Sequence, residues 1–558
     1  MVTVWRSDTT RILIRIVAGL VLALGLILPA QARVLARHAA AGLPVLREQY
    51  FGAPWIPSLD PAIAGDTASI DLIYMVQANL VKYLPNGNPI PDLAHWKISK
   101  NHRVYTFTIR KGAVFSNGDP VTAQDVKFSL TRSLAKATGS GVASLYLGHI
   151  LGAKKLEAGK TNKLQGVKVL NSRQVQITVD RPIAFFLEQL TFSTAQVLDP
   201  KFVRGKKPGT YLTDTCAANV GAGPFKFVCR NNSTSVNSFY PPGQSPTITL
   251  VPNPRYYGPK PHIKVVLSAV ASIDTEYRAF QAGEIDVTGV PTPDIAKVRN
   301  QPGFLSYPTS LVDFLTANED RPPFNNVHCR LALTYAINRN VITHQILHDS
   351  ESPLYEVLPR GMLGYYPGSN LPHYNPAKAR AELAQCPGGI HNISLAMPNT
   401  SSDLTNEYTA VVNMWQAVGI NVKLNSVPLS AFVRDWENHL NTTNTDLIVN
   451  DWAEDYNDPQ DYMTFLLHSG QPRDIGDFRN KTYDRLVDKA EVTFNKAKRV
   501  ALYTRAQQIA INAGAWIPIG QSRQYILLKP YVHGFVGSPI TPIFPKGMNW
   551  ANIKITKH

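Results

Sequence analysis

Apolar and polar side chains alternate over short stretches of the chain in patterns that predict strands. From Val104 to Arg110 the apolar Tyr105, Phe107 and Ile109 alternate with polar residues. Successive side chains of a strand point to opposite faces, so this stretch predicts a strand with one buried face.

Helices are indicated by residues that cap their first turn. Thr122 predicts the N-cap of a helix that reaches Arg132, and Asn375, followed by proline, predicts the N-cap of a helix that reaches Gln385. Residues 481–513 have a largely helical pattern. The mixture of strands and helices predicts an α/β architecture with more than one sheet.

The first 32 residues differ in composition from the rest of the chain. Three arginines precede the apolar run Ile16–Leu28, and a short segment ending in Ala32 follows it. This order predicts a secretory signal peptide over residues 1–32 and therefore an exported protein. The run is shorter than the roughly 20 residues of a spanning helix. Retention of the leader as an N-terminal anchor is the alternative.

Length and charge limit the possible classes of protein. A chain of 558 residues with 44% hydrophobic residues predicts a globular protein of two or more lobes. Its formal charge of +16 comes from scattered lysines and arginines, without a nucleic-acid-binding motif. We therefore expect a solvated basic surface and no nucleic-acid partner.

Four cysteines permit two disulfides in an oxidising compartment. They allow three connectivities, between which the sequence does not decide, and they are Cys216, Cys229, Cys329 and Cys386. We favour a Cys216–Cys229 disulfide because these two residues flank one short segment.

Five stretches carry motifs that cover nearly the whole chain after the leader. They are 91–126, 221–225 with 253–258, 281–287, 323–339 and 452–459. In their residues and in their order, these stretches together resemble the family 5 solute-binding proteins, the oligopeptide and dipeptide receptors of ABC importers.

The resemblance implies a bilobal, periplasmic-binding-protein-like class II fold with a hinge and an extra inserted subdomain in lobe 1. Lobe 1 would be discontinuous, and lobe 2 would lie between its parts. The implied boundaries are 33–75 and 201–310 for two parts of lobe 1, 76–200 for the inserted subdomain, 311–522 for lobe 2, and 523–558 for the return to lobe 1.

A cluster of acidic residues follows a predicted strand ending at Asn450. The spacing lacks the glycine of a calcium-binding loop, so we predict no metal site there. We expect Asp451, Asp458 and Asp461 to be solvated.

Asp455 differs from the other acids because Trp452 and Tyr456 are close to it in sequence. Aromatic side chains lower the local dielectric constant, so a carboxylate beside them attracts a cation more strongly than it would in water. In the family, the aspartate of the matching Trp-x-x-Asp-Tyr block pairs with the α-amino group of the ligand. The resemblance therefore implies that Asp455 binds the amine, with Trp452 and Tyr456 beside it. Glu454 either tunes the affinity or points to water.

Two weaker patterns leave alternatives open. Phe314 aligns with a segment that lines the cleft near the hinge, and a core position in a strand is the alternative. His344 and His348 have the spacing of one helical face, which can bind metal, but a surface helix is the favoured interpretation. We predict no catalytic residues, no metal site and no cofactor.

The resemblance implies the substrate-binding component of an ABC importer. It would act as a monomer in the periplasmic space or at the outer face of the cytoplasmic membrane. There it would bind di- or oligopeptides between its lobes and deliver them to a permease and ATPase complex. Alternatives are the same fold with an oligosaccharide, a nickel chelate or an opine-like amine as cargo, or a secreted hydrolase.

Overall fold

The computed structural model describes the chain with several gaps. The described ranges are 42–51, 58–65, 67–84, 87–203, 220–228, 247–270, 272–368, 370–429, 431–432, 446–471, 473–537 and 550–556. The predicted leader and both Cys216 and Cys229 lie outside these ranges, so cleavage of the leader and that disulfide stay predictions.

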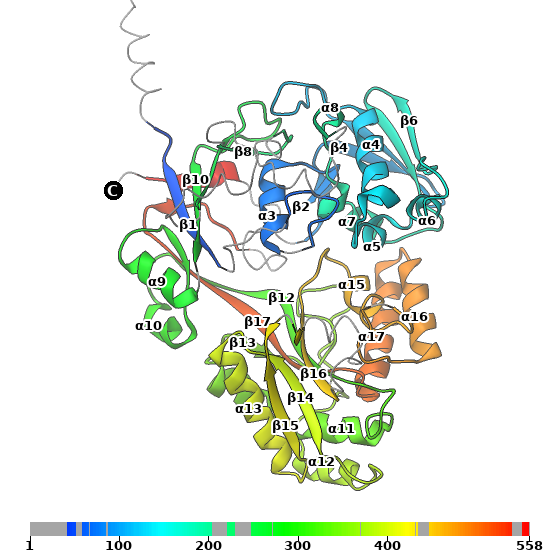
Figure 1. The fold of residues 1–558 in the computed structure, drawn as a ribbon, viewed down its shortest axis with the longest axis vertical. Coiled ribbons are helices and arrows are strands. Elements are labelled where there is room, and N and C mark those ends of the chain that lie inside the picture. Colours follow the sequence, from blue (N-terminus) through cyan, green and yellow to red (C-terminus); the bar gives the residue numbers. More distant parts are fainter. Residues whose placement is uncertain are drawn as a thin grey trace, which may run out of the picture. The chain divides into compact units, whose positions relative to one another are not determined.

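One large mixed sheet organises the described part of residues 46–558, which form a single compact unit (Figure 1). Its strands lie in the order β15 (Val422–Val427), β14 (Ile393–Pro398), β16 (Leu447–Trp452), β12 (Phe304–Ala317), β17 (Ile517–Leu528), β11 (Val287–Gly289), β1 (Val45–Phe51), β10 (Lys264–Val270), β9 (Thr247–Pro252) and β8 (Phe225–Phe227), with β13 (Glu351–Pro353) also paired to β17.

Strands β12 and β17 connect two lobes. They pair antiparallel along nearly their whole length, with breaks in register between Pro308 and Val312 and between Asp313 and Phe314. On one side β17 pairs with β11, and on the other β12 pairs with β16. Separate hydrophobic cores lie on the two sides of these breaks. We call the side with β1 and β8–β11 lobe 1 and the side with β14–β16 lobe 2. The bilobal α/β prediction is confirmed, whereas its boundaries stay predictions.

Lobe 1 also contains a small antiparallel sheet that belongs to the predicted inserted subdomain. Its order is β4 (Ala94–Ile98), β5 (Val104–Ile109), β7 (Gln174–Thr178) and β6 (Val167–Asn171), and β2 (Val81–Tyr83) pairs separately with β3 (Pro89–Pro91). Tyr105, Phe107 and Ile109 are buried along β5, which confirms the predicted strand.

Short helices complete lobe 1. They are α3 (Thr67–Val76), α4 (Ala123–Leu134), α5 (Ala143–Leu147), α6 (Ala153–Glu157), α7 (Phe186–Gln189), α8 (Pro200–Val203), α9 (Ile273–Gln281) and α10 (Ile295–Val298), with 3-10 turns η1 (Lys136–Thr138), η2 (Ser193–Ala195), η4 (Thr292–Asp294) and η6 (Trp550–Asn552). The predicted N-cap Thr122 forms a reciprocal capping box with Asp125, which satisfies two backbone donors of the first turn of α4. A two-stranded sheet of β18 (Val532–His533) and β19 (Lys554–Ile555) lies near the end of the chain.

Lobe 2 has helices of 4 to 17 residues. They are α11 (Val327–Ala336), α12 (Pro376–Leu383), α13 (Ser402–Gln416), α15 (Gln460–Met463), α16 (Lys481–Glu491) and α17 (Lys496–Asn512), with the π-helical segment η5 (Val341–Ile346). Asn375 caps α12 as predicted, but the helix ends at Leu383, two residues early.

A buried disulfide joins Cys329 of α11 to Cys386, just beyond α12. Among the described residues, we find no helix that combines the length and apolar character needed to cross a bilayer.

Candidate ligand-binding site

The acidic segment after β16 forms contacts between lobe 2 and lobe 1. The Tyr146 hydroxyl of α5 donates a hydrogen bond to Asp455 Oδ2. The backbone N–H of Asn457 donates to Tyr83 Oη at 2.9 Å, and Asn457 Nδ2 donates to the carbonyl oxygen of Gly87 at 3.2 Å. Asp455, which the sequence singled out, therefore lies where the two lobes meet.

Tyr456 packs into the core of lobe 1 rather than standing open to solvent. Its side chain is 2% exposed. Its ring centroid lies 5.9 Å from that of Tyr146, edge to face, and 6.1 Å from that of Phe185, nearly parallel. Burying this ring holds the neighbouring Asp455 against lobe 1.

Asp458 is not solvated, so that expectation was wrong. It is 2% exposed, and its two carboxylate oxygens accept hydrogen bonds of 2.6 and 2.7 Å from Arg499 of α17. A buried carboxylate is stable only when it is paired, and this pair gives Asp458 a charged partner with matching geometry. It ties the acidic segment to the helices of lobe 2.

The expectation of a solvated Asp461 was also wrong. Its side chain is 1% exposed, and its Oδ2 accepts hydrogen bonds from Trp452 Nε1 at 3.0 Å and from the backbone N–H of Asp455 at 2.9 Å. Asp461 therefore fixes both the indole ring and the backbone of the residue predicted to bind an amine. Burial, followed by the nearby charge of Asp455, raises the pKa of Asp461.

Two tyrosines of lobe 1 lie near Asp455. Burial and then the negative charge of Asp455 raise the pKa of the Tyr146 hydroxyl, which keeps it a hydrogen-bond donor. The pKa of Tyr74 on α3 is raised by burial, then by Asp455 and by Asp71 of the same helix. Asp455 and Asp71 thus act on the same hydroxyl group.

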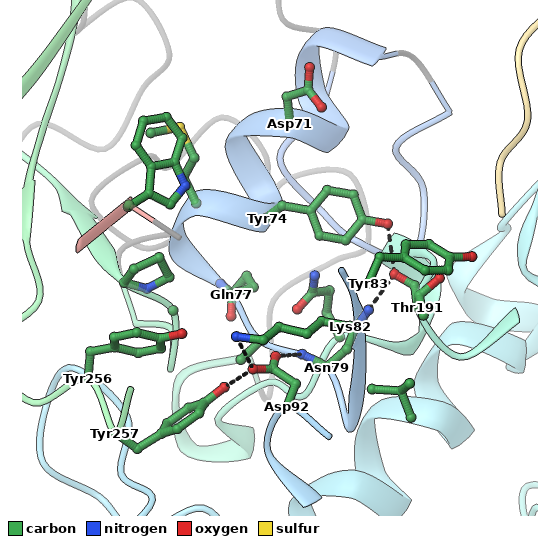
Figure 2. A pocket seen from close by; sticks show the side chains of 17 residues that line it. Asp71, Tyr74, Gln77, Asn79, Lys82, Tyr83, Asp92, Thr191, Tyr256 and Tyr257 are labelled. Carbon is green, nitrogen blue, oxygen red and sulfur yellow. Dashed lines mark hydrogen bonds and ion pairs between the residues drawn. The ribbon is translucent and has the colours of Figure 1, made fainter. Parts of the chain in front are cut away.

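A cavity of about 90 Å³ lies beside Tyr74 (Figure 2). The Tyr74 hydroxyl donates to the carbonyl oxygen of Thr191 at 2.8 Å, and Asn79 Nδ2 donates to the same oxygen at 2.6 Å. Across the cavity, Lys82 Nζ lies 3.5 Å from Asp92 Oδ1. The Tyr74–Thr191 hydrogen bond joins α3 to residues of the predicted inserted subdomain and so sets the position of Tyr74.

Phe314 and Trp452 line a second, smaller cavity on the lobe 2 side of the hinge strands. Phe314 is 4% exposed and stacks on Trp516 with ring centroids 3.5 Å apart. Trp452 packs on Phe465 at 5.5 Å. The structure therefore brings two of the four predicted site residues to one cavity and the other two to the contact with lobe 1. Their roles in binding stay predictions.

The remaining acids of the segment have different surroundings. Glu454 is 4% exposed and its Oε2 lies 3.4 Å from the Tyr462 hydroxyl, so the interpretation that it points to water was wrong. Asp451 is exposed.

The histidine pattern does not form one helical face. His344 lies in the π-helical segment, while His348 follows it with a positive φ of 47°. His344 Nδ1 lies 2.6 Å from Asp349 Oδ1. The ranges that the structure describes contain no group of three or more histidine, cysteine, aspartate or glutamate side chains placed to hold a metal ion.

Sequence reasoning missed Tyr146, Tyr74 and Asp71. Each lies far from residue 455 in the chain. The packing of the two lobes brings Tyr146 and Tyr74 near Asp455, and Asp71 acts on Tyr74. A buried tyrosine in a helix has no sequence signal that separates a site residue from a core residue.

The structure has two α/β lobes, two continuous strands that join them, and a carboxylate where the lobes meet. This arrangement is that of a bilobal binding protein. Residues 88–474 match the family model described as bacterial extracellular solute-binding proteins, family 5 middle. The chain belongs to this family, whose members are binding proteins.

Curated relatives and solved structures agree with this assignment. The chain is 25% identical over 496 residues to the probable D,D-dipeptide-binding periplasmic protein DdpA of Escherichia coli, covering 87% of this chain and 90% of the relative. It is 27% identical over 489 residues to the oligopeptide-binding protein OppA of Bacillus subtilis, covering 83% and 85%. The structure of the Escherichia coli murein tripeptide binding protein MppA superposes with a TM-score of 0.76 at 25% identity, covering 93% of this chain and 99% of that one.

Proposed function

We propose that this protein binds peptides between its two lobes and delivers them to the permease and ATPase complex of an ABC importer. The observation that carries the proposal is the position of Asp455, whose carboxylate extends from lobe 2 to the Tyr146 hydroxyl of lobe 1. Relatives named for binding dipeptides, oligopeptides and murein peptides support the class of cargo.

Asp455 is the group that binds the α-ammonium of the peptide. It lies beside buried aromatic side chains, where a charge pair is stronger than in water. A ligand that contacts Asp455 also lies close to Tyr146 of lobe 1, so it can contact both lobes. Ligand binding then favours the arrangement in which the lobes are closed on each other.

The protein is exported, acts as a monomer outside the cytoplasmic membrane, and catalyses no reaction. The competing assignment, a secreted hydrolase, predicts product formation. The receptor predicts stoichiometric binding and a rise in thermal stability with peptide concentration.

Isothermal titration calorimetry with tripeptides tests the proposal. Asp455→Asn leaves the ligand ammonium without its partner, which costs roughly 3 kcal/mol or more and weakens binding at least about a hundredfold. The matched control is Asp488→Asn, which removes the same charge from an exposed position on α16 of lobe 2 and leaves the affinity unchanged.

N-acetylated tripeptides lack the ammonium and should bind the wild-type protein as weakly as free tripeptides bind the Asp455→Asn variant. Equal affinity of Asp455→Asn and wild type for free tripeptides would show that this carboxylate does not bind the amine. Binding of sugars or a nickel chelate in place of every peptide would overturn the peptide cargo.

A further inference from the structure

A third and larger cavity lies away from Asp455, on lobe 1 beside the hinge strands. Its volume is about 360 Å³, four times that of the cavity beside Tyr74. Strands β1, β11 and β17 and helix α9 form its walls. The size is within the range of pockets that hold small organic molecules, roughly 300 to 1,000 Å³.

The cavity has two buried carboxyl groups and mainly apolar walls. Glu48 of β1 and Glu276 of α9 both line it, and each is 7% exposed. Glu276 Oε1 accepts a hydrogen bond of 2.8 Å from the backbone N–H of Gly289. Glu48 Oε2 is buried and accepts no hydrogen bond from any residue in the part of the chain that the structure describes. The apolar side chains of the lining are Ile273, Val287, Val290, Ile295 and Ile526.

Two other acids, Glu276 and Asp71, act on the carboxyl group of Glu48. Burial, then Glu276 and then Asp71, raises its pKa, and the pKa of Glu276 is raised to about 7, chiefly by burial. Arg523 lines the same cavity, but its Nη2 donates to Ser306 Oγ at 2.9 Å. A buried, unpaired carboxylate is unfavourable, so Glu48 must hold either a proton or a cation.

We propose that this cavity binds a small organic cation, with a terminal ammonium or guanidinium at Glu48 and Glu276 and a short alkyl chain against the apolar wall. A cation supplies the missing donor to Glu48 Oε2 and neutralises the two carboxylates, while the isoleucine and valine side chains cover its alkyl carbons. The residues that form this site do not include Asp455, so the site can bind a cation whether or not Asp455 binds a peptide amine.

Calorimetry on the full-length protein with n-butylamine and 1-butylguanidine tests the site. We expect one equivalent to bind the wild type, 1-butanol to give no binding, and Glu48→Gln to weaken binding at least about tenfold, since a charge-assisted hydrogen bond is lost. Glu276→Gln should weaken it as well. The matched control, Glu284→Gln, alters an exposed acid just beyond α9 and should change nothing.

The pH dependence of cation affinity in the wild-type protein tests the site without a substitution. The cation must displace protons from Glu48 and Glu276, so its affinity should rise at least about tenfold between pH 5.5 and pH 8.5. The other titratable or charged groups facing Glu48 are Asp71 of α3, Tyr307 of β12 and Arg523 of β17. A flat profile, or equal binding by Glu48→Gln and wild type, would overturn the proposal.

The ammonium could belong to a free amine or to a lysine of a bound peptide. A comparison of alanyl-lysyl-alanine with trialanine distinguishes the two sources. Tighter binding of the lysine peptide that disappears in Glu48→Gln assigns the cavity to a peptide side chain. Simultaneous binding of trialanine and n-butylamine assigns it to a free cation. Either result supports the site. Asp455→Asn should leave the affinity for n-butylamine unchanged, so a failure of the peptide-binding proposal would not be mistaken for a failure of this site.

Discussion

The hydroxyl of Tyr146 donates a hydrogen bond to the carboxylate of Asp455, although 309 positions separate the two residues. One belongs to the inserted subdomain of lobe 1 and the other to the acidic segment of lobe 2. The residue expected to bind the ligand amine is therefore positioned by both lobes at once.

Tyr146→Phe should weaken peptide binding. The change keeps the buried ring and its contact with Tyr456 but removes a hydrogen bond to a charged group, which contributes about 1.5 to 3 kcal/mol. We expect the dissociation constant from calorimetry to rise roughly tenfold to a hundredfold. The control is Tyr105→Phe, whose hydroxyl donates to the carbonyl oxygen of Ile183 within lobe 1, and it should leave the affinity unchanged. Identical binding by Tyr146→Phe and wild type would contradict this role.

Asp458→Asn should destabilise the protein strongly. It leaves the buried guanidinium of Arg499 without its counter-charge, a change that costs about 3 to 5 kcal/mol. Asp320→Asn provides a matched control. Both carboxylate oxygens of Asp320 accept hydrogen bonds from Arg479, but this pair is exposed at the surface. Exposed pairs contribute at most about 1 kcal/mol. Urea denaturation should separate the two variants clearly, and equal midpoints would show that the buried pair does not stabilise the fold.

Stability should fall as the pH rises through the neutral range. Asp313 of β12 and Glu351 of β13 form a hydrogen-bonded carboxyl pair on the two sides of β17. Burial, and then Glu407 of α13, raises the pKa of Glu351 from its ordinary value of 4.5 to about 8. The folded protein therefore keeps a proton that the unfolded chain has released. The contribution of this pair to the free energy of unfolding is fully present below about pH 4.5 and is lost as the pH rises to about 8.

Urea midpoints at pH 5 and pH 8.5 measure this effect. Glu351→Gln should reduce the difference between the urea midpoints at the two pH values without abolishing it. The remaining difference comes from groups such as Glu188 and Asp474, whose pKa values burial also raises to about 8. Glu284→Gln, an exposed acid, should keep the slope of the wild type. A slope that Glu351→Gln leaves unaltered would rule out this pair as its source.

Local patterns in the sequence were sufficient for elements whose causes are local. Thr122 caps α4 because its hydroxyl and the Asp125 carboxylate lie within one turn of each other. The alternation along β5 persists because one face of that strand packs on a core. The aromatic neighbours of Asp455 singled out a residue that lies at the contact of the two lobes, and its role in binding an amine stays a prediction.

The sequence-based predictions that were wrong concern side chains whose partners are distant in sequence, or a segment whose backbone geometry was not expected. Asp458 is buried because Arg499, 41 residues away, supplies its counter-charge. A polar residue with such a partner looks the same in the sequence as a solvated one. The spacing of His344 and His348 brings two side chains together only on an α-helix, and this segment is π-helical.

The Cys329–Cys386 disulfide affects any attempt to produce the protein. It closes a loop between residues 57 positions apart within the core of lobe 2 and should contribute roughly 4 kcal/mol by restricting the unfolded chain. Thiols in a bacterial cytoplasm stay reduced. Material purified from that compartment would be a covalently different molecule with a weaker lobe 2, so the redox state of a preparation has to be established before affinities or midpoints are compared between laboratories.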